Sequence, residues 1–150
     1  MKTIYPTELT SPALQKIMQT AVAPRPIAFV SSINKKGDVN LAPFSFFNMF
    51  STVPPILVFS PSRRVRDNTT KHTLENVLEV PEVVIGIANY AMVQQVSLSS
   101  TEYEEGVNEF VKAGFTMKDA DVVRPKLIAE SPVNFCLLYT SPSPRDATLS

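Results

Sequence analysis

Basic and hydroxyl side chains gather between residues 60 and 73, where the sequence reads SPSRRVRDNTTKHT. The cations of this stretch are Arg63, Arg64, Arg66 and Lys71. The hydroxyl and amide side chains between them are Ser60, Ser62, Asn68, Thr69, Thr70 and Thr73. Cations in front of a helix would hold a phosphate group, because the free N–H groups and the dipole of the helix also favour an anion there. The alternative is a solvated polar loop that Asn68 or Thr69 caps.

A single arginine stands between two prolines in the stretch APRPIAFVSS. A proline restricts the residue before it to extended backbone, so Arg25 is held on a stiff arm at the entrance to an apolar strand. From this position its guanidinium could contact a phosphate or a carboxylate. The alternative is an ordinary surface arginine at the start of a strand.

Three polar residues, Asn40, Ser45 and Asn48, are interspersed with four phenylalanines in NLAPFSFFNMFS. A mostly apolar wall with a few fixed polar groups is typical of a small-molecule pocket. The alternative is an aromatic core strand whose polar positions have no function. We assign no catalytic residue, because the one histidine, His72, has no defined partner with which to form an acid–base set.

Runs of β-forming residues predict the strands that must position these groups. The predicted strands cover residues 26–33, 39–50, 54–60 and 82–89, with a last one in ESPVNF at 130–135. The polar turn NKKGD joins the first two strands into a hairpin. Pro43 implies an edge, a bulge or a break in the second strand, since proline lacks a ladder donor. The continuous apolar run of the third strand indicates burial on both faces.

Helical spacing predicts helices in four further segments, within residues 6–21, 67–80, 91–100 and 107–114. The apolar positions of the first are Leu14, Ile17 and Met18. The N-cap candidates of the second are Asp67, Asn68 and Thr69, and its apolar positions are Leu74, Val77 and Leu78. The last helix is predicted to end at Gly114, in a C-cap position.

Strands come first in this order, and helices are inserted between them without regular β–α–β alternation. The pattern favours a mainly β fold with helical insertions, an antiparallel barrel or α+β domain rather than a Rossmann fold. The chain has four glycines, and none forms a G-x-G-x-x-G or Walker-type loop. Any nucleotide-like ligand must therefore be held by other means.

The amino-acid composition argues against several classes of protein. A formal net charge of zero argues against a nucleic-acid partner, which would need a basic excess. One cysteine and one histidine provide neither a disulfide nor a cysteine- or histidine-rich metal site. No apolar run approaches the roughly 20 residues of a membrane-spanning helix. The start, MKTIYPTELT, lacks an apolar signal segment, so we expect a soluble cytoplasmic protein without a membrane partner.

The C-terminal segment, Cys136 to Ser150, is rich in serine, proline and threonine and has no apolar period, which is typical of a disordered terminus. Its first part, CLLYTSPSPRD, can also be back-translated into the constant arm of a transposase-based sequencing adapter. We therefore predict a truncated domain at residues 1–135 and a non-native or disordered tail at 136–150. The DNA sequence across the Phe135–Cys136 junction decides whether the tail is native.

Together these stretches form an ordered series of motifs: R-P-I-A-x-V-S, N-x-A-P-x-S-x-F, P-P, S-x-x-R and K-x-T-L-x-N. The series in RPIAFVSSINKKGDVNLAPFSFFNMFSTVPPILVFSPSRRVRDNTTKHTLENV resembles the flavin reductase-like, FMN-binding split-barrel family, in the branch that includes flavoredoxin. The later stretches STEY, GVNEFVKAGF and AESPVNF also look like this branch. The resemblance covers roughly residues 20 to 135.

The resemblance implies a six-stranded Greek-key split barrel with helical insertions, incomplete at the C-terminus, that works as a homodimer with FMN near the dimer interface. Its ring-lining residues would be Arg25, Pro26 and Ile27, with polar contacts from Ser45 and Asn48. Its phosphate side would be formed by Arg63, Arg64, Asn68, Lys71 and Thr73. His72 departs from the family pattern, which has an acidic residue before the threonine.

The chemistry that the resemblance implies belongs to the cofactor, with electrons passing from NADH or NADPH through FMN to a small-molecule or redox-protein acceptor. The leading interpretation is an FMN-dependent oxidoreductase of the flavin reductase type. One alternative is a non-catalytic FMN-binding module for electron transfer. Another is a fragment without function as written, since missing closing strands would leave open sheet edges.

Overall fold

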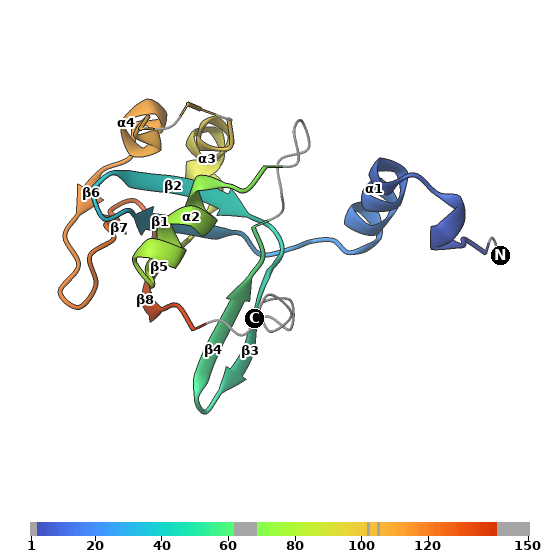
Figure 1. Ribbon diagram of the computed structural model, residues 1–150, viewed down its shortest axis with the longest axis horizontal. Helices are drawn as coiled ribbons and strands as arrows, with labels where there is room; N and C mark the ends of the chain where they lie inside the picture. Colours follow the sequence, from blue (N-terminus) through green and yellow to red (C-terminus); the bar gives the residue numbers. More distant parts are fainter. Residues whose placement is uncertain (1–2, 62–68, 102, 105, 141–150) are drawn as a thin grey trace.

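The computed structural model describes residues 3–61, 69–101, 103–104 and 106–140 (Figure 1). The strands are β1 (Ala28–Ile33), β2 (Val39–Phe44), β3 (Phe47–Thr52), β4 (Pro55–Phe59), β5 (Glu82–Ile87), β6 (Met117–Lys118), β7 (Leu127–Ile128) and β8 (Asn134–Leu138). The helices are η1 (Pro6–Glu8), α1 (Ser11–Ala21), α2 (His72–Glu79), η2 (Tyr90–Met92), α3 (Val93–Ser99) and α4 (Glu109–Ala113). The fold is mainly β with inserted helices, as predicted. Among the described helices, none has the length and apolar character needed to cross a membrane.

A four-stranded antiparallel sheet in the order β2-β1-β5-β8 forms the body of the protein. The predicted polar turn joins β1 to β2, and Asn34 organises it. The Asn34 Oδ1 atom accepts hydrogen bonds from the N–H groups of Lys36 and Asp38, each at 2.9 Å. Gly37 adopts a φ of +95°, a conformation that glycine reaches without a steric penalty. This turn sets the register of the first hairpin.

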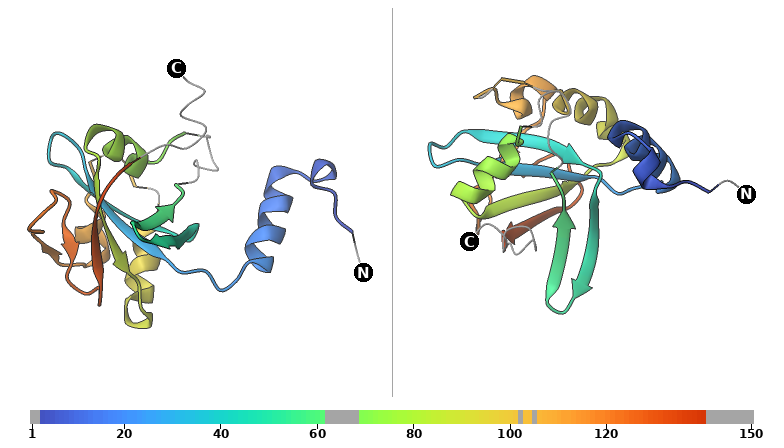
Figure 2. Two further views of the ribbon diagram at one scale, coloured as in Figure 1. Left: turned by 90° about the horizontal axis from the view of Figure 1, so that it is seen from below. Right: turned by 45° about the vertical axis from the view of Figure 1, so that its right-hand side comes forward.

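Successive side chains of β1 enter two different cores, because neighbouring residues of a strand point to opposite faces of the sheet. One core contains Phe29, Leu41, Met92, Phe110, Ala113, Phe115 and Ile128. The other contains Ala28, Val30, Phe44, Val77, Val83 and Ile85. Helices α3 and α4 therefore cover one face of the sheet and α2 packs against the other, as Figure 2 shows from two sides.

The stretch predicted as one strand at 39–50 is divided in the structure. Strand β2 ends at Phe44 and β3 begins at Phe47, so Ser45 and Phe46 form a corner that leads into a separate β3–β4 hairpin (Figure 1). Pro43 lies within β2 at the edge of the central sheet, one of the positions that its missing N–H predicted.

The prediction that the third strand is buried on both faces is wrong. Strand β4 pairs with β3 alone, and the hairpin projects from the body of the protein (Figure 1). Ile56 and Val58 are 43% and 46% exposed. An apolar run indicates that a strand favours burial, but it does not indicate which part of the protein will pack against it.

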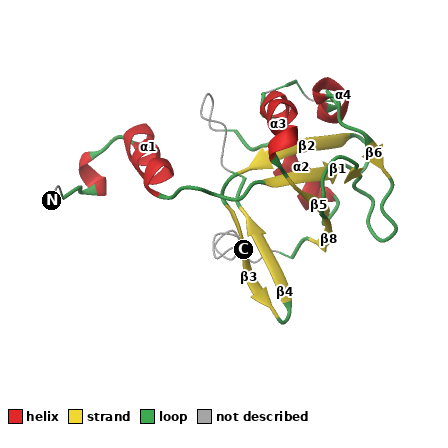
Figure 3. Ribbon diagram, turned by 180° about the vertical axis from the view of Figure 1, so that it is seen from behind, coloured by secondary structure: helices red, strands yellow, loops and turns green. Residues whose placement is uncertain are grey.

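Helix α1 forms where it was predicted, but its apolar side joins neither core. The connecting chain before β1 is extended, and the helix stands apart from the sheet (Figures 1 and 3). None of its residues is buried, and Met18 is 57% exposed. Arg25 caps the C-terminal end of α1. Its Nη1 atom donates hydrogen bonds to the carbonyl oxygens of Gln19 at 2.6 Å and Val22 at 2.5 Å.

Helix α2 begins later than predicted. Its N-cap is Lys71, whose side chain makes no capping hydrogen bond, so the predicted cap at Thr69 is wrong. The other two cap candidates, Asp67 and Asn68, lie outside the described residues. On the predicted apolar side of the helix, Val77 is buried, whereas Leu78 is 68% exposed.

Strand β8 crosses the predicted domain end at Phe135. Cys136 lies opposite Val84 of β5, and Leu138 lies opposite Glu82. The first residues of the segment interpreted as a tail therefore continue the central sheet. The origin of that segment stays a prediction, which the DNA sequence at the junction tests.

Candidate functional site

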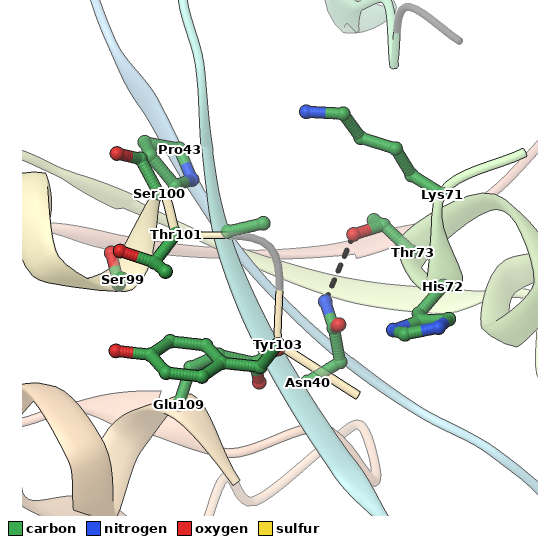
Figure 4. Close-up of a pocket in the computed structure, with 11 residues that line it drawn as sticks. Asn40, Pro43, Lys71, His72, Thr73, Ser99, Ser100, Thr101, Tyr103 and Glu109 are labelled. Carbon is green, nitrogen blue, oxygen red and sulfur yellow. Dashed lines mark hydrogen bonds between the residues drawn. The ribbon is translucent and has the colours of Figure 1, made fainter. Parts of the chain in front are cut away.

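A polar pocket lies where β2, the start of α2, the chain after α3 and the start of α4 meet (Figure 4). Its volume is about 60 Å³. It is lined by Asn40, Ala42, Pro43, Lys71, His72, Thr73, Ser99, Ser100, Thr101, Tyr103 and Glu109. Hydroxyl and amide groups predominate in this lining, so the pocket suits a small polar group.

A buried hydrogen bond joins two elements of the pocket. The Asn40 side chain donates from Nδ2 to Oγ1 of Thr73 at 2.9 Å, and both residues are buried (Figure 4). The bond fixes the first turn of α2 against the edge strand β2. Breaking it would leave a buried amide without its partner, which costs about 1–3 kcal/mol.

Donor groups lie on both sides of the pocket. Lys71 is the N-cap of α2, and its Nζ lies 5.2 Å from the centroid of the Phe44 ring, so an aromatic face orients the ammonium group. Ser100 and Thr101 approach from the opposite side, after α3 (Figure 4). An anion between the two sides would meet a cation, hydroxyl donors and the positive end of the α2 dipole.

Glu109 is the one carboxylic acid among the described lining residues. It is the first residue of α4 and only 7% exposed, and its Oε2 accepts a hydrogen bond from the N–H of Leu41 at 3.1 Å. Burial raises the pKa of the Glu109 carboxyl above 4.5, against the smaller lowering effect of the backbone N–H groups of Glu109 and Leu41. A protonated Glu109 would tolerate a bound anion better than an ionised one.

Replacing Glu109 by glutamine is expected to raise the free energy of unfolding at neutral pH. Because the folded chain holds this proton more tightly than the unfolded chain, the stabilisation is complete below pH 4.5 and is lost as the pH rises through the raised pKa. Glutamine keeps an acceptor for the Leu41 N–H and carries no charge, so E109Q removes this decline. Urea unfolding over a pH series measures it.

The matched control for this prediction is Glu8→Gln, which removes an exposed carboxylate far from the pocket. This control should keep the pH dependence of the parent chain. Stability curves of E109Q and the parent that stay parallel from pH 4.5 upward would contradict the assignment.

The predicted site residues lie in several places. Lys71 and Thr73 line the polar pocket. The residues predicted to line a ring lie elsewhere, with Arg25, Pro26 and Ile27 before β1, Ser45 at the corner after β2 and the exposed Asn48 on β3. Three others, Arg63, Arg64 and Asn68, lie outside the described residues. The assignment of all these residues to a cofactor stays a prediction.

Sequence reasoning missed half of the pocket. The sequence predicts Ser99 and Ser100 at the end of a helix and Glu109 within another, and it assigns Thr101 to the acidic loop between them. The signal that could have found them is the hydroxyl-rich SLSST at 97–101, which follows an amphipathic helix. Glu109 gave no such signal, because a glutamate in the first turn of a helix is ordinary.

Comparison with known proteins shows the family. The model of the flavin reductase-like domain matches residues 19–147, which runs past the domain end predicted at Phe135. A protein of Aquifex aeolicus without an assigned function is 41% identical over 133 residues, which are 88% of this chain and 67% of that protein. The chain spans 57–67% of the length of the curated relatives that it matches.

Solved structures agree with this match. Nitrilotriacetate monooxygenase component B from Bacillus cereus is 28% identical, with a TM-score of 0.87 over 92% of this chain and 67% of that one. Flavoredoxin of Desulfovibrio vulgaris (Miyazaki F) is 19% identical, with a TM-score of 0.67 over 78% of this chain and 61% of that one, which shows a shared fold. The resemblance recognised in the motifs is thereby confirmed, and the chain belongs to the flavin reductase-like domain family and has its split-barrel fold.

Proposed function

We propose that this chain binds FMN and serves as a flavin reductase-type oxidoreductase, with NADH or NADPH as donor. The observation that carries the proposal is the convergence of Lys71, Thr73 and Thr101 on one pocket of a flavin reductase-like chain. A cation, two hydroxyl groups and a helix N-terminus are the donor set that a phosphate monoester requires. When bound, FMN would take up a hydride from the nicotinamide donor and deliver electrons to the acceptor.

The polar pocket fits the phosphate end of such a cofactor and not its ring. Its volume of about 60 Å³ is far below the roughly 300–1,000 Å³ of a site that encloses a whole organic ligand. In the proposal Lys71 and the hydroxyl groups hold the phosphate, while Asn40 keeps Thr73 in place. The ring would lie outside this pocket, along the entrance to β1 at Arg25 to Ile27 and the corner at Ser45.

We further propose that a second copy of the chain completes the ring site. The β3–β4 hairpin exposes large apolar side chains, including Met49 at 60% and Phe50 at 69%. Exposed apolar groups of this kind favour association. A homodimer would cover them and would shield the ring from water.

Anaerobic titration of the chain with FMN and with riboflavin, which lacks the phosphate, tests the proposal. Because charge-assisted hydrogen bonds to the phosphate are worth about 1.5–3 kcal/mol, FMN should bind at least roughly tenfold more tightly than riboflavin. NADH or NADPH should then bleach the flavin absorbance of the complex.

Two other outcomes have distinct meanings. Bleaching by a reduced redox protein, but by neither nicotinamide, would identify an electron-transfer module instead of a reductase. A chain that binds neither flavin, or that binds riboflavin as tightly as FMN, would remove the proposed phosphate site.

A further inference from the structure

A second, apolar pocket lies between α1 and the corner after β2, and we call it the α1 pocket. Its volume is about 450 Å³, within the range of roughly 300–1,000 Å³ typical of small-molecule sites. It is lined by Ser11, Leu14, Gln15, Met18, Gln19, Val22, Arg25 and Phe46. This lining has apolar walls, two side-chain amides on successive turns of α1, and a single charged group.

The charged group of the α1 pocket is only partly used by the protein. Arg25 Nη1 donates to two carbonyl oxygens at the end of α1, and the Arg25 Cζ lies 6.0 Å from the centroid of the Phe46 ring. The Nε atom is buried and has no hydrogen-bond partner among the described residues. A buried donor without a partner costs free energy, so this nitrogen favours a ligand that accepts its hydrogen bond.

Charge determines the chemical class of that ligand. No acidic residue is among the eight described residues that line the pocket, so nothing in the lining neutralises Arg25. The edge of a guanidinium that carries Nε and Nη2 presents two parallel N–H groups, which match the two oxygens of a carboxylate. Because Nη1 already holds α1, the edge that carries Nε and Nη2 is the one left for a ligand, which must displace the atoms that now cover Nε.

The apolar side chains that line the α1 pocket indicate which group the ligand carries beside its carboxylate. Leu14, Met18 and Phe46 offer aliphatic, thioether and aromatic surfaces, which pack well against a flat ring. We propose that the α1 pocket binds an aromatic carboxylate, with the carboxylate on the Nε edge of Arg25 and the ring between α1 and Phe46. The α1 pocket shares no lining residue with the polar pocket, so phosphate binding and carboxylate binding can be tested separately. Arg25 is also one of the residues proposed above to line the flavin ring, so an aromatic carboxylate would compete with that ring, and its binding is measured on the flavin-free chain.

Benzoate is the probe, and methyl-¹³C methionine NMR of the flavin-free chain is the readout. Met18 lines the pocket, whereas Met92 lies in the core at 2% exposed and serves as the internal control. Benzoate should shift the Met18 methyl signal in a saturable way and leave that of Met92 in place. The Met18 signal is identified by its loss in M18L.

A neutral analogue isolates the role of charge without any mutation. Benzamide has the ring and the size of benzoate but no negative charge, so its affinity should be lower by roughly 10- to 100-fold. Equal affinity for the two would overturn the proposed carboxylate recognition. A Met18 signal that does not respond to benzoate, or that shifts with protein concentration alone because a second copy fills the groove, would also overturn it.

Two variants complete the test. R25Q should weaken benzoate binding by roughly 10- to 100-fold, but it also removes the cap of α1. L14E leaves Arg25 in place and adds a carboxylate to the wall, so it should also abolish the Met18 response to benzoate. The matched control is Val111→Glu, the same kind of change at an α4 position that is 69% exposed, and it should bind benzoate like the parent chain.

Discussion

Replacing Gly86 by alanine lowers the free energy of unfolding by about 1–3 kcal/mol. Alanine in a strand is ordinarily better than glycine, so a general effect would have the opposite sign. A Cβ atom at this position would lie 2.6 Å from Cδ1 of Ile128 and 3.1 Å from Oγ of Ser131. Ile128 is fully buried in the core with Phe29 and Phe110, so a shift of its Cδ1 atom has to disturb close-packed neighbours. Urea unfolding of G86A measures the loss.

The atom responsible for the clash can be removed. Ile128→Val deletes Cδ1 and by itself should cost about 0.5–1.5 kcal/mol. If the contact with this atom dominates, the G86A/I128V double variant loses less stability than the sum of the two single changes. Strict additivity of the two losses would show that the Ile128 contact is not the cause.

Gly86 lies where the segment that contains Ile128 and Ser131 packs against β5. Gly86 pairs with Phe29 of β1 and with Asn134 of β8, so it lies in the middle of the central sheet. Asn134 in turn uses both ends of its side-chain amide on Ile128, accepting from its N–H at 3.1 Å and donating to its carbonyl at 3.0 Å. The missing side chain lets this segment pack directly on β5.

Replacing Lys71 by glutamate lowers the affinity for FMN by about 100-fold or more, if the proposed phosphate site is correct. The change removes a charge-assisted hydrogen bond, worth about 1.5–3 kcal/mol, and places a carboxylate where the phosphate would bind. Riboflavin has no phosphate, so its affinity should stay within about twofold of that of the parent. Fluorescence quenching of each flavin gives both dissociation constants.

The control for the Lys71 prediction is Lys118→Glu, the same charge reversal on the exposed strand β6. It should leave the affinity for FMN unchanged, which separates a local contact from a change in the net charge of the chain. K71E and K118E variants with the same affinity for FMN would mean that the phosphate lies elsewhere. A K71E variant that loses riboflavin binding as well would point to a damaged fold.

Local patterns in the sequence were sufficient for most secondary structure. The strands β1 and β5 and the helix at α1 follow from runs and periods of neighbouring residues. The end of α4 follows from a single residue, because Gly114 takes a φ of +73° that other residues adopt only at a cost. The motif series also identified the family, since it records an order of residues rather than a geometry.

The exposure of apolar side chains could not be predicted from local patterns in the same way. The apolar run at β4 predicted burial on both faces, yet Ile56 is 43% exposed. Met18, one of the apolar positions predicted along α1, is 57% exposed. The corner at Ser45 explains this for the hairpin, because the chain leaves the central sheet there. Phe47, Leu57 and Phe59 still pack against the second core, whereas Ile56 and Val58 between them stay 43% and 46% exposed. Burial is a property of what packs against a segment, and a segment's own residues do not contain that information.

The sequence by itself determined the family, the positions of most longer strands and helices, and the cationic, hydroxyl-rich stretch that includes Lys71 and Thr73. Tertiary structure alone decided what surrounds them. Asn40 reaches Thr73 across 33 residues of chain, and Glu109 reaches Leu41 across 68. Contacts at such separations depend on strand register and helix packing, which many distant residues set together. Helix and strand periods arise from neighbours within a few positions, and for that reason they can be read directly from the sequence.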